Sequence, residues 1–238
     1  MKKYFLSLVA FLLFTGIHAQ KTFVNDANAE VRNITGSFNN IIISGGIDLY
    51  LSQYDKVAVA VSAVTDEYRQ DIKTVVDNNT LKIFYDGGKG WNKGNKKMKV
   101  YVSFTNLEKL KASGACDVVV AGVVEVPTLT LNMNGASDFK GAVKVNTLTM
   151  DLSGSSDAAI SGSANVLNIE SSGASDIKGF GLVTEVCNAK VSGASDINIT
   201  VNKELNVNAS GASDVYYKGT AEVKDKHTSG ASSVVKKG

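Results

Sequence analysis

The sequence is poor in proline, cysteine, histidine and arginine. One proline, two cysteines and two histidines occur among 238 residues, and the only arginines are Arg32 and Arg69. His18 lies in an N-terminal segment that we expect to be removed, so the mature chain keeps only His227. A Ser-His-Asp hydrolase has no suitable base in such a chain. The low proline content, with many Gly, Ser, Val and Asn residues, favours β-structure with tight turns.

Residues 1–19 are typical of a signal peptide. Lys2 and Lys3 precede an apolar run that ends near Ala19, where we expect cleavage. The run is too short to span a bilayer comfortably, and no later segment is a transmembrane candidate. Without the two lysines, 23 basic residues stand against 23 acidic ones, which gives no basic surface for nucleic acid. The sequence predicts an exported protein that is periplasmic, outer-membrane-associated or secreted.

One motif, Ser-Gly-Ala-Ser-Asp, recurs through the second half of the chain. Its glycines are separated by 21, 19, 19, 20, 18 and 19 residues, and they are Gly114, Gly135, Gly154, Gly173, Gly193, Gly211 and Gly230. Alternating apolar and polar residues precede each copy, as in Leu129 to Met133, and predict a half-buried strand. A steady period with strands at one phase predicts an all-β protein, a parallel β-helix or β-solenoid with rungs of 19 to 20 residues.

The repeats divide the mature chain into two parts. Residues 107–238 form the predicted repetitive solenoid, in which the polar stretch Lys224 to Thr228 marks a terminal capping repeat. Residues 20–106 lack the repeat but are rich in predicted strands, with one short helix expected over Asp66 to Thr74. We expect this N-terminal part to cap or continue the solenoid, because an open rung invites edge-to-edge pairing.

The motif is first of all a corner of the solenoid. Glycine permits the bend, and Ser and Asp hydrogen-bond the backbone of the turn. Stacking places one aspartate above another in a column, where neighbouring carboxylates repel by about 0.8 kcal/mol in water. Backbone amides, Lys140 and Lys178 are candidate compensating groups. The alternative is Ca²⁺ bridging between rungs, although the nonapeptide of calcium β-rolls is missing. The calcium candidates are Asp117, Asp138, Asp157, Asp176, Asp196 and Asp214.

The two cysteines are predicted to be free thiols. Cys187 has the phase of the core leucines, whereas Cys116 lies at a corner three to four rungs away. That separation is roughly 15 Å by rung spacing, too far for a disulfide.

A glycine- and lysine-rich loop, Asp86 to Lys99, holds the only tryptophan. Trp91, Lys93, Lys96 and Lys97 are candidate contacts to a sugar ring or an anionic head group. The alternative is a charged hairpin loop without a ligand.

The chain also resembles a family of bacterial exported proteins named putative auto-transporter adhesin, head GIN domain. The resemblance rests on Phe38 to Ile41, Ser44 to Leu51, Leu81 to Ile83, Leu107 to Leu110 and the train of corner motifs. It implies an all-β solenoid with a role in adhesion or surface binding, and it offers no catalytic residue.

These observations predict a non-catalytic, cofactor-free protein whose repetitive faces contact an extended glycan or protein. Two alternatives stay open. The first is a structural envelope protein that self-associates as a homo-oligomer. The second is a polysaccharide-active β-helix enzyme, which a uniform aspartate ladder does not favour because paired catalytic carboxylates need unlike environments.

Overall fold

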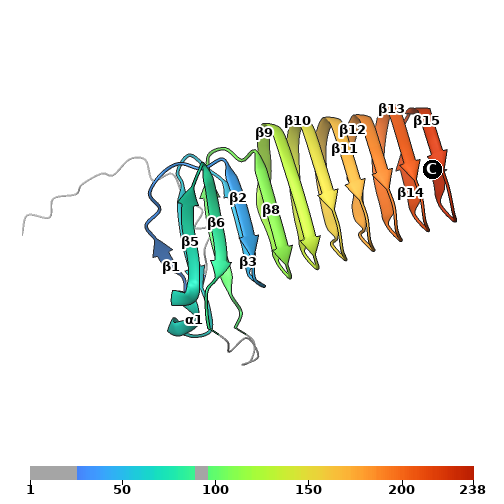
Figure 1. Cartoon of the computed structure of the whole chain (residues 1–238). Coiled ribbons are helices and arrows are strands. Elements are labelled where there is room, and N and C mark those ends of the chain that lie inside the picture. Colours follow the sequence, from blue (N-terminus) through green and yellow to red (C-terminus); the bar gives the residue numbers. More distant parts are fainter. Residues whose placement is uncertain (1–25, 89–95) are drawn as a thin grey trace, which may run out of the picture.

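The computed structural model describes residues 26–88 and 96–238, which form an elongated β-solenoid of about seven turns with rungs of about 19 residues (Figure 1). The strands of this part belong to one 16-stranded sheet that winds around a single hydrophobic core. The predicted all-β solenoid class is confirmed. One short helix lies at the N-terminal end of the coil (Figure 1).

The repetitive part runs from β8 to the C-terminus. Its strands pair in parallel with the same phase of the next turn, and most bend through a whole rung. They are β8 (Lys109–Gly114), β9 (Asp117–Gly135), β10 (Asp138–Leu152), β11 (Ala158–Ser171), β12 (Ile177–Val191), β13 (Asp196–Ala209), β14 (Asp214–Lys218), β15 (Glu222–Thr228) and β16 (Ser233–Lys236).

Apolar residues of equal phase stack into columns inside the coil. One column contains Leu129, Leu148, Leu167, Cys187 and Leu205, which are each at most 1% exposed. The period-two pattern therefore sets the inward and outward faces as the sequence predicts. Cys187 is a small member of this core column, Cys116 is also buried, and both thiols are free, as expected.

The corner glycines allow the rungs to approach closely. Gly173 has φ +84°, and a Cβ on it would lie 2.3 Å from the carbonyl oxygen of Gly154 in the rung before. The next residue, Ala174, donates its N–H to that same oxygen at 2.8 Å. A side chain on Gly173 would thus collide with the atom that carries the rung-to-rung hydrogen bond.

Two further rungs come from the N-terminal part. β2 (Asn40–Ser44) and β3 (Asp48–Gln53) pair in parallel with β8 and β9. On their other side they pair in parallel with β6 (Thr80–Tyr85) and β7 (Lys99–Phe104). The N-terminal part continues the solenoid, although the order of its rungs in space differs from their order in the chain.

Antiparallel strands cover the outermost N-terminal rung. β4 (Ala58–Ser62) pairs with β7, β1 (Glu30–Arg32) pairs with β4, and β5 (Ile72–Asp77) pairs with β6. The helix α1 (Asp66–Asp71) connects β4 to β5, with Thr65 as its N-cap. It is three residues shorter than predicted, because Ile72 is extended and buried and starts a β-branched run that pairs with β6.

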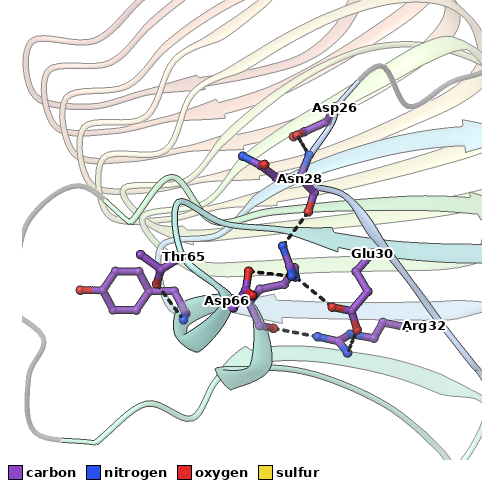
Figure 2. Close-up of polar contacts among 8 residues, drawn as sticks. Asp26, Asn28, Glu30, Arg32, Thr65 and Asp66 are labelled. Atoms are coloured by element: carbon purple, nitrogen blue, oxygen red, sulfur yellow. Dashed lines mark hydrogen bonds and ion pairs between the residues drawn. The ribbon is translucent and has the colours of Figure 1, made fainter.

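Both arginines hold this cap together, and Figure 2 shows their contacts. Arg69 ion-pairs with Glu30 at 2.9 Å and with Asp66 at 2.8 Å, and it donates to the carbonyl of Asn28. Arg32 ion-pairs with Glu30 and donates to the carbonyl of Arg69 at 2.8 Å. These bonds tie the edge strand β1 to α1.

Candidate functional site

The aspartates of the corner motif form the predicted column. Asp138 is in register with Asp117, and Asp214 is in register with Asp196. The backbone N–H of Asp157 donates to Asp138 Oδ1 at 3.2 Å, and the N–H of Asp176 donates to Asp157 Oδ1 at 3.2 Å. Each of these carboxylates thus accepts the amide of the next rung, which is one of the two forms of compensation that the sequence suggested.

Lysines contribute less to the column than the amides do. Lys178 approaches Asp157 at 3.5 Å, and both side chains are largely exposed, so the pair adds little. Within residues 26–88 and 96–238, no cluster of three or more His, Cys, Asp or Glu side chains is arranged to hold a metal ion. The main contacts of the column carboxylates in this part of the chain are therefore the hydrogen bonds that they accept from backbone N–H groups.

The column has one more member than the repeat indicated. Asp48 precedes Leu49, which pairs with Val118, so Asp48 lies beside Asp117. Burial raises the pKa of Asp48, and the charge of Asp117 raises it further, while Lys99 opposes the shift. The first rung therefore carries a corner motif of its own, Ser44 to Asp48, without the usual alanine and serine.

The far end of the column is stabilised differently. Asp214 accepts hydrogen bonds from the hydroxyls of Ser233 at 2.6 Å and Tyr216 at 2.9 Å. These bonds lower the pKa of Asp214. Ser233 replaces the aspartate of the last rung and thereby ends the run of like charges with a donor.

A second column explains the serine before each aspartate. Its members are fully buried, and they are Ser137, Ser156, Ser175, Ser195 and Ser213. Ser175 Oγ accepts the N–H of Ser156 at 3.3 Å and donates to the carbonyl of Ser172 at 3.2 Å. Cys116 takes this position in the first repeat and donates from Sγ to the carbonyl of Ser113. The corner motif thus satisfies buried backbone groups, which is a structural role.

The candidate contacts in the glycine-rich loop are only partly described. Trp91 and Lys93 lie outside the described residues. Lys96 is 8% exposed, and its ammonium lies 4.1 Å from the ring centre of Tyr85 and 5.3 Å from that of Tyr68. Lys97 is exposed and has a positive φ of 43°.

A groove on an outward face of the solenoid was not anticipated from the sequence. It has a volume of about 470 Å³ and crosses six consecutive rungs. Two columns of outward side chains line it, two residues apart on each strand. The first column is Thr130, Thr149, Asn168, Asn188, Asn206 and Asp225, and the second is Asn132, Asp151, Glu170, Lys190, Asn208 and His227.

The asparagines of the first column form an amide ladder. Asn206 Nδ2 donates to Asn188 Oδ1 at 2.9 Å, and Asn188 Nδ2 donates to Asn168 Oδ1 at 2.9 Å. In the second column, Asn132 Nδ2 donates to Asp151 at 3.3 Å. Asn132 Oδ1 is buried and has no hydrogen-bond partner, and it is the one such side-chain atom in the part of the chain described.

Carboxylates outnumber cations in the groove: Asp151, Glu170 and Asp225 lie there with Lys190, and His227 is charged only when protonated. Glu170 and Lys190 form an ion pair at 2.8 Å, which raises the pKa of Lys190. The Nε2 atom of His227 lies 3.0 Å from Oδ1 of Asp225. The groove therefore presents amides, hydroxyls, one neutralised ion pair and two further carboxylates. Alternation in the sequence marked these residues as outward, but nothing in it distinguished this face from the others.

Comparison with known proteins places the chain in a family. Residues 37–221 match the family described as "Putative auto-transporter adhesin, head GIN domain". The chain belongs to this family. The match spans both N-terminal rungs and the repeats through Ala221, and it confirms the resemblance seen in the motifs. The family's description fits an exported or surface protein. No curated protein matches the chain.

Solved structures show the same fold. The chain is 21% identical to a protein described as a putative adhesin from Bacteroides fragilis, with a TM-score of 0.75 over 89% of this chain and 96% of the other. It is also 21% identical to a putative adhesin from Parabacteroides distasonis, with a TM-score of 0.70 over 89% and 98%. A protein described as a putative lipid binding protein from Parabacteroides distasonis is 19% identical, with a TM-score of 0.67 over 90% and 98%.

No helix among the described residues is long and apolar enough to cross a membrane.

Proposed function

We propose that this protein is an exported, non-catalytic, adhesin-type protein that binds an extended partner along the groove of its solenoid. The observation that carries the proposal is the groove itself, in which polar side chains of equal phase repeat over six rungs. A partner with its own repeat meets equivalent groups at every rung, so weak contacts add along its length. Membership of an adhesin family supports the same conclusion.

The partner is an envelope or extracellular glycan or protein. Amides and hydroxyls in the groove suit polar ligands, and lateral contacts between long faces need no deep pocket. The lipid-binding description of one structural neighbour concerns that protein. In this chain twelve of the sixteen residues that line the groove have polar side chains, which supports a polar partner.

Self-association is the competing function. The last rung, β15 and β16, is the exposed end of the sheet, and lysines lie on it at Lys224, Lys226 and Lys236. Charged side chains on an edge strand oppose pairing with another copy, because the new contact would remove water from them. On β15, Glu222 and Asp225 accompany the lysines, and Lys224 pairs with Glu222 at 2.8 Å. The edge therefore favours a partner on the groove face over a second copy at the end.

Co-sedimentation tests the proposal. Purified mature protein is spun with envelope fragments of the bacterium that encodes it, next to variants Asn188→Ala in the groove and Asn198→Ala on another outward face. We expect retention by the wild type and Asn198→Ala and reduced retention of Asn188→Ala. Equal retention of both variants, or no retention of the wild type, contradicts binding through the groove. Homo-oligomer bands on cross-linking without any retention would favour self-association.

A further inference from the structure

We infer that the groove binds an uncharged polysaccharide chain lying along the solenoid axis, with its hydroxyls bound by the asparagine ladder. The inference rests on the proposed function and deepens it, because it names the chemical class of the partner.

The ladder fixes the asparagines and leaves hydrogen-bonding capacity on them, although both N–H groups of Asn206 are taken, by Asn188 and Glu204. A side-chain amide has two N–H donors and two acceptor lone pairs. Asn188 gives one N–H to Asn168 and accepts one from Asn206. One donor and one lone pair remain on Asn188, and both are available at an exposed side chain. A hydroxyl both donates and accepts, so neighbouring hydroxyls of a sugar ring match this remaining pair.

The ladder is also prearranged for such a partner. Hydrogen bonds along the column hold each amide plane in place before anything binds, so less side-chain freedom is lost on association. Thr130 and Thr149 continue the same column with hydroxyl groups. Amides and hydroxyls of one phase thus follow the solenoid axis without interruption from β9 to β13.

An unpaired acceptor marks the start of the groove. Asn132 Oδ1 is buried but accepts no hydrogen bond, although its amide nitrogen is bound to Asp151. Buried polar atoms without partners are rare in proteins and costly. Because this oxygen is buried, a hydroxyl of a bound chain could donate to it only if the Asn132 side chain turned toward the groove.

The charges in the groove favour an uncharged chain. Lys190 is already paired with Glu170, and His227 faces Asp225. Asp151 adds a negative charge beside Asn132. An anionic polysaccharide would therefore meet repulsion from Asp151 near one end of the groove and from Asp225 at the other, and no unpaired lysine within it. A neutral chain avoids this repulsion.

The spacing of the groups suits a polymer of sugars. Rungs of a parallel solenoid lie about 4.8 Å apart. One sugar unit of an extended polysaccharide has a length close to this spacing, so successive units can meet successive rungs. The backbone N–H and C=O groups of these rungs are already paired with neighbouring rungs. A peptide strand on the same face could therefore contact only side chains and could not pair as an additional β-strand.

Affinity electrophoresis tests the inference with defined probes. The mature protein migrates through gels that contain β-glucan, xylan, galactomannan or dextran, and through gels that contain alginate or heparin. We expect retardation by at least one neutral polysaccharide and none by the anionic ones. Asn188→Ala should weaken that interaction about tenfold, which corresponds to the loss of two hydrogen bonds. Asn198→Ala and Trp91→Ala should migrate as the wild type does.

The results separate this inference from the proposed function. Retardation by alginate or heparin alone, or neutral binding that Asn188→Ala leaves unchanged, overturns the inference. Absence of neutral binding together with groove-dependent retention on envelope fragments also overturns it, and the proposed function then stands with a protein partner. Protease treatment of the fragments would abolish retention in that case, whereas periodate, which cleaves vicinal diols, would abolish it if a glycan is bound.

Discussion

Close approach of successive corners predicts that alanine at a corner glycine is far more costly than alanine at an equally strained glycine elsewhere. Gly173 and Gly122 have almost the same positive φ, +84° and +83°. A Cβ on Gly122 meets no atom within 4 Å, whereas a Cβ on Gly173 lies 2.3 Å from the carbonyl oxygen of Gly154. The pair separates backbone strain from steric collision.

The magnitudes follow from these two terms. A non-glycine residue in the left-handed region costs about 1 kcal/mol, which is the whole expected effect of Gly122→Ala. Gly173→Ala adds overpacking against backbone, about 2 kcal/mol, because the oxygen it strikes also accepts the N–H of Ala174. At this chain length, melting temperatures should fall by about 3 °C and about 9 °C respectively.

Thermal unfolding followed by circular dichroism at 218 nm measures both variants against the wild type. Urea midpoints provide an independent measure of the same difference. Equal losses for Gly173→Ala and Gly122→Ala would refute the claim that corner contacts between rungs require glycine.

Four further predictions concern the columns. Ser175→Ala should cost about 1–3 kcal/mol in urea denaturation, because it leaves the buried N–H of Ser156 without an acceptor; a neutral result would show that the hydroxyl ladder is dispensable. Asp48→Asn should stabilise the protein at neutral pH, since the raised pKa of Asp48 beside Asp117 means that its ionised form is disfavoured in the fold. That gain should vanish as acid protonates the wild-type carboxyl. Asp214→Asn should destabilise the protein at neutral pH. The lowered pKa of Asp214 means that its carboxylate contributes stability above the unfolded-state pKa, and this contribution is lost as the pH falls through the folded-state pKa. Melting curves from pH 7 to pH 3 in which both variants change the stability in the same direction would contradict this. Ca²⁺ and excess chelator should give the same melting temperature, because corner carboxylates accept amide hydrogen bonds, and a calcium-dependent rise would establish a metal ladder.

The sequence predicts the repetitive part of the fold well, because its signals are local. Alternation fixes which residues of Leu129 to Met133 point inward, and the recurring glycine fixes the rung length. The serine and aspartate columns follow from stacking identical corners. Cys116 is understood once its neighbours at the same phase are serines.

The N-terminal rungs were harder to place because their order in space is not their order in the chain. The corner of the first rung, Ser44 to Asp48, stacks on Ser113 to Asp117, although about seventy residues separate them. Its Ser-Gly-x-x-Asp spacing is shared with the repeats and is the signal that could have revealed it. β6 and β7 pair with β2 and β3 on the side away from the repeats. This pairing depends on contacts between residues far apart in the sequence, which a periodic pattern cannot predict.

The groove could not be located from the sequence for a related reason. Outward positions are recognisable from alternation, but every rung has several of them. Only the register shows that Asn168, Asn188 and Asn206 share one column and hydrogen-bond in sequence. The unpaired oxygen of Asn132 is likewise a property of packing.

Thiol footprinting tests the central claim, binding along the groove, most directly. Burial raises the pKa of Cys116 and raises that of Cys187 to about 12, so neither native thiol competes for a maleimide reagent. Single variants Asn208→Cys, in the groove, and Asn198→Cys, on another outward face, are modified with and without envelope fragments. The account predicts slower modification at position 208 when fragments are present and an unchanged rate at position 198. Equal rates at both positions, with the protein bound to the fragments, would contradict it.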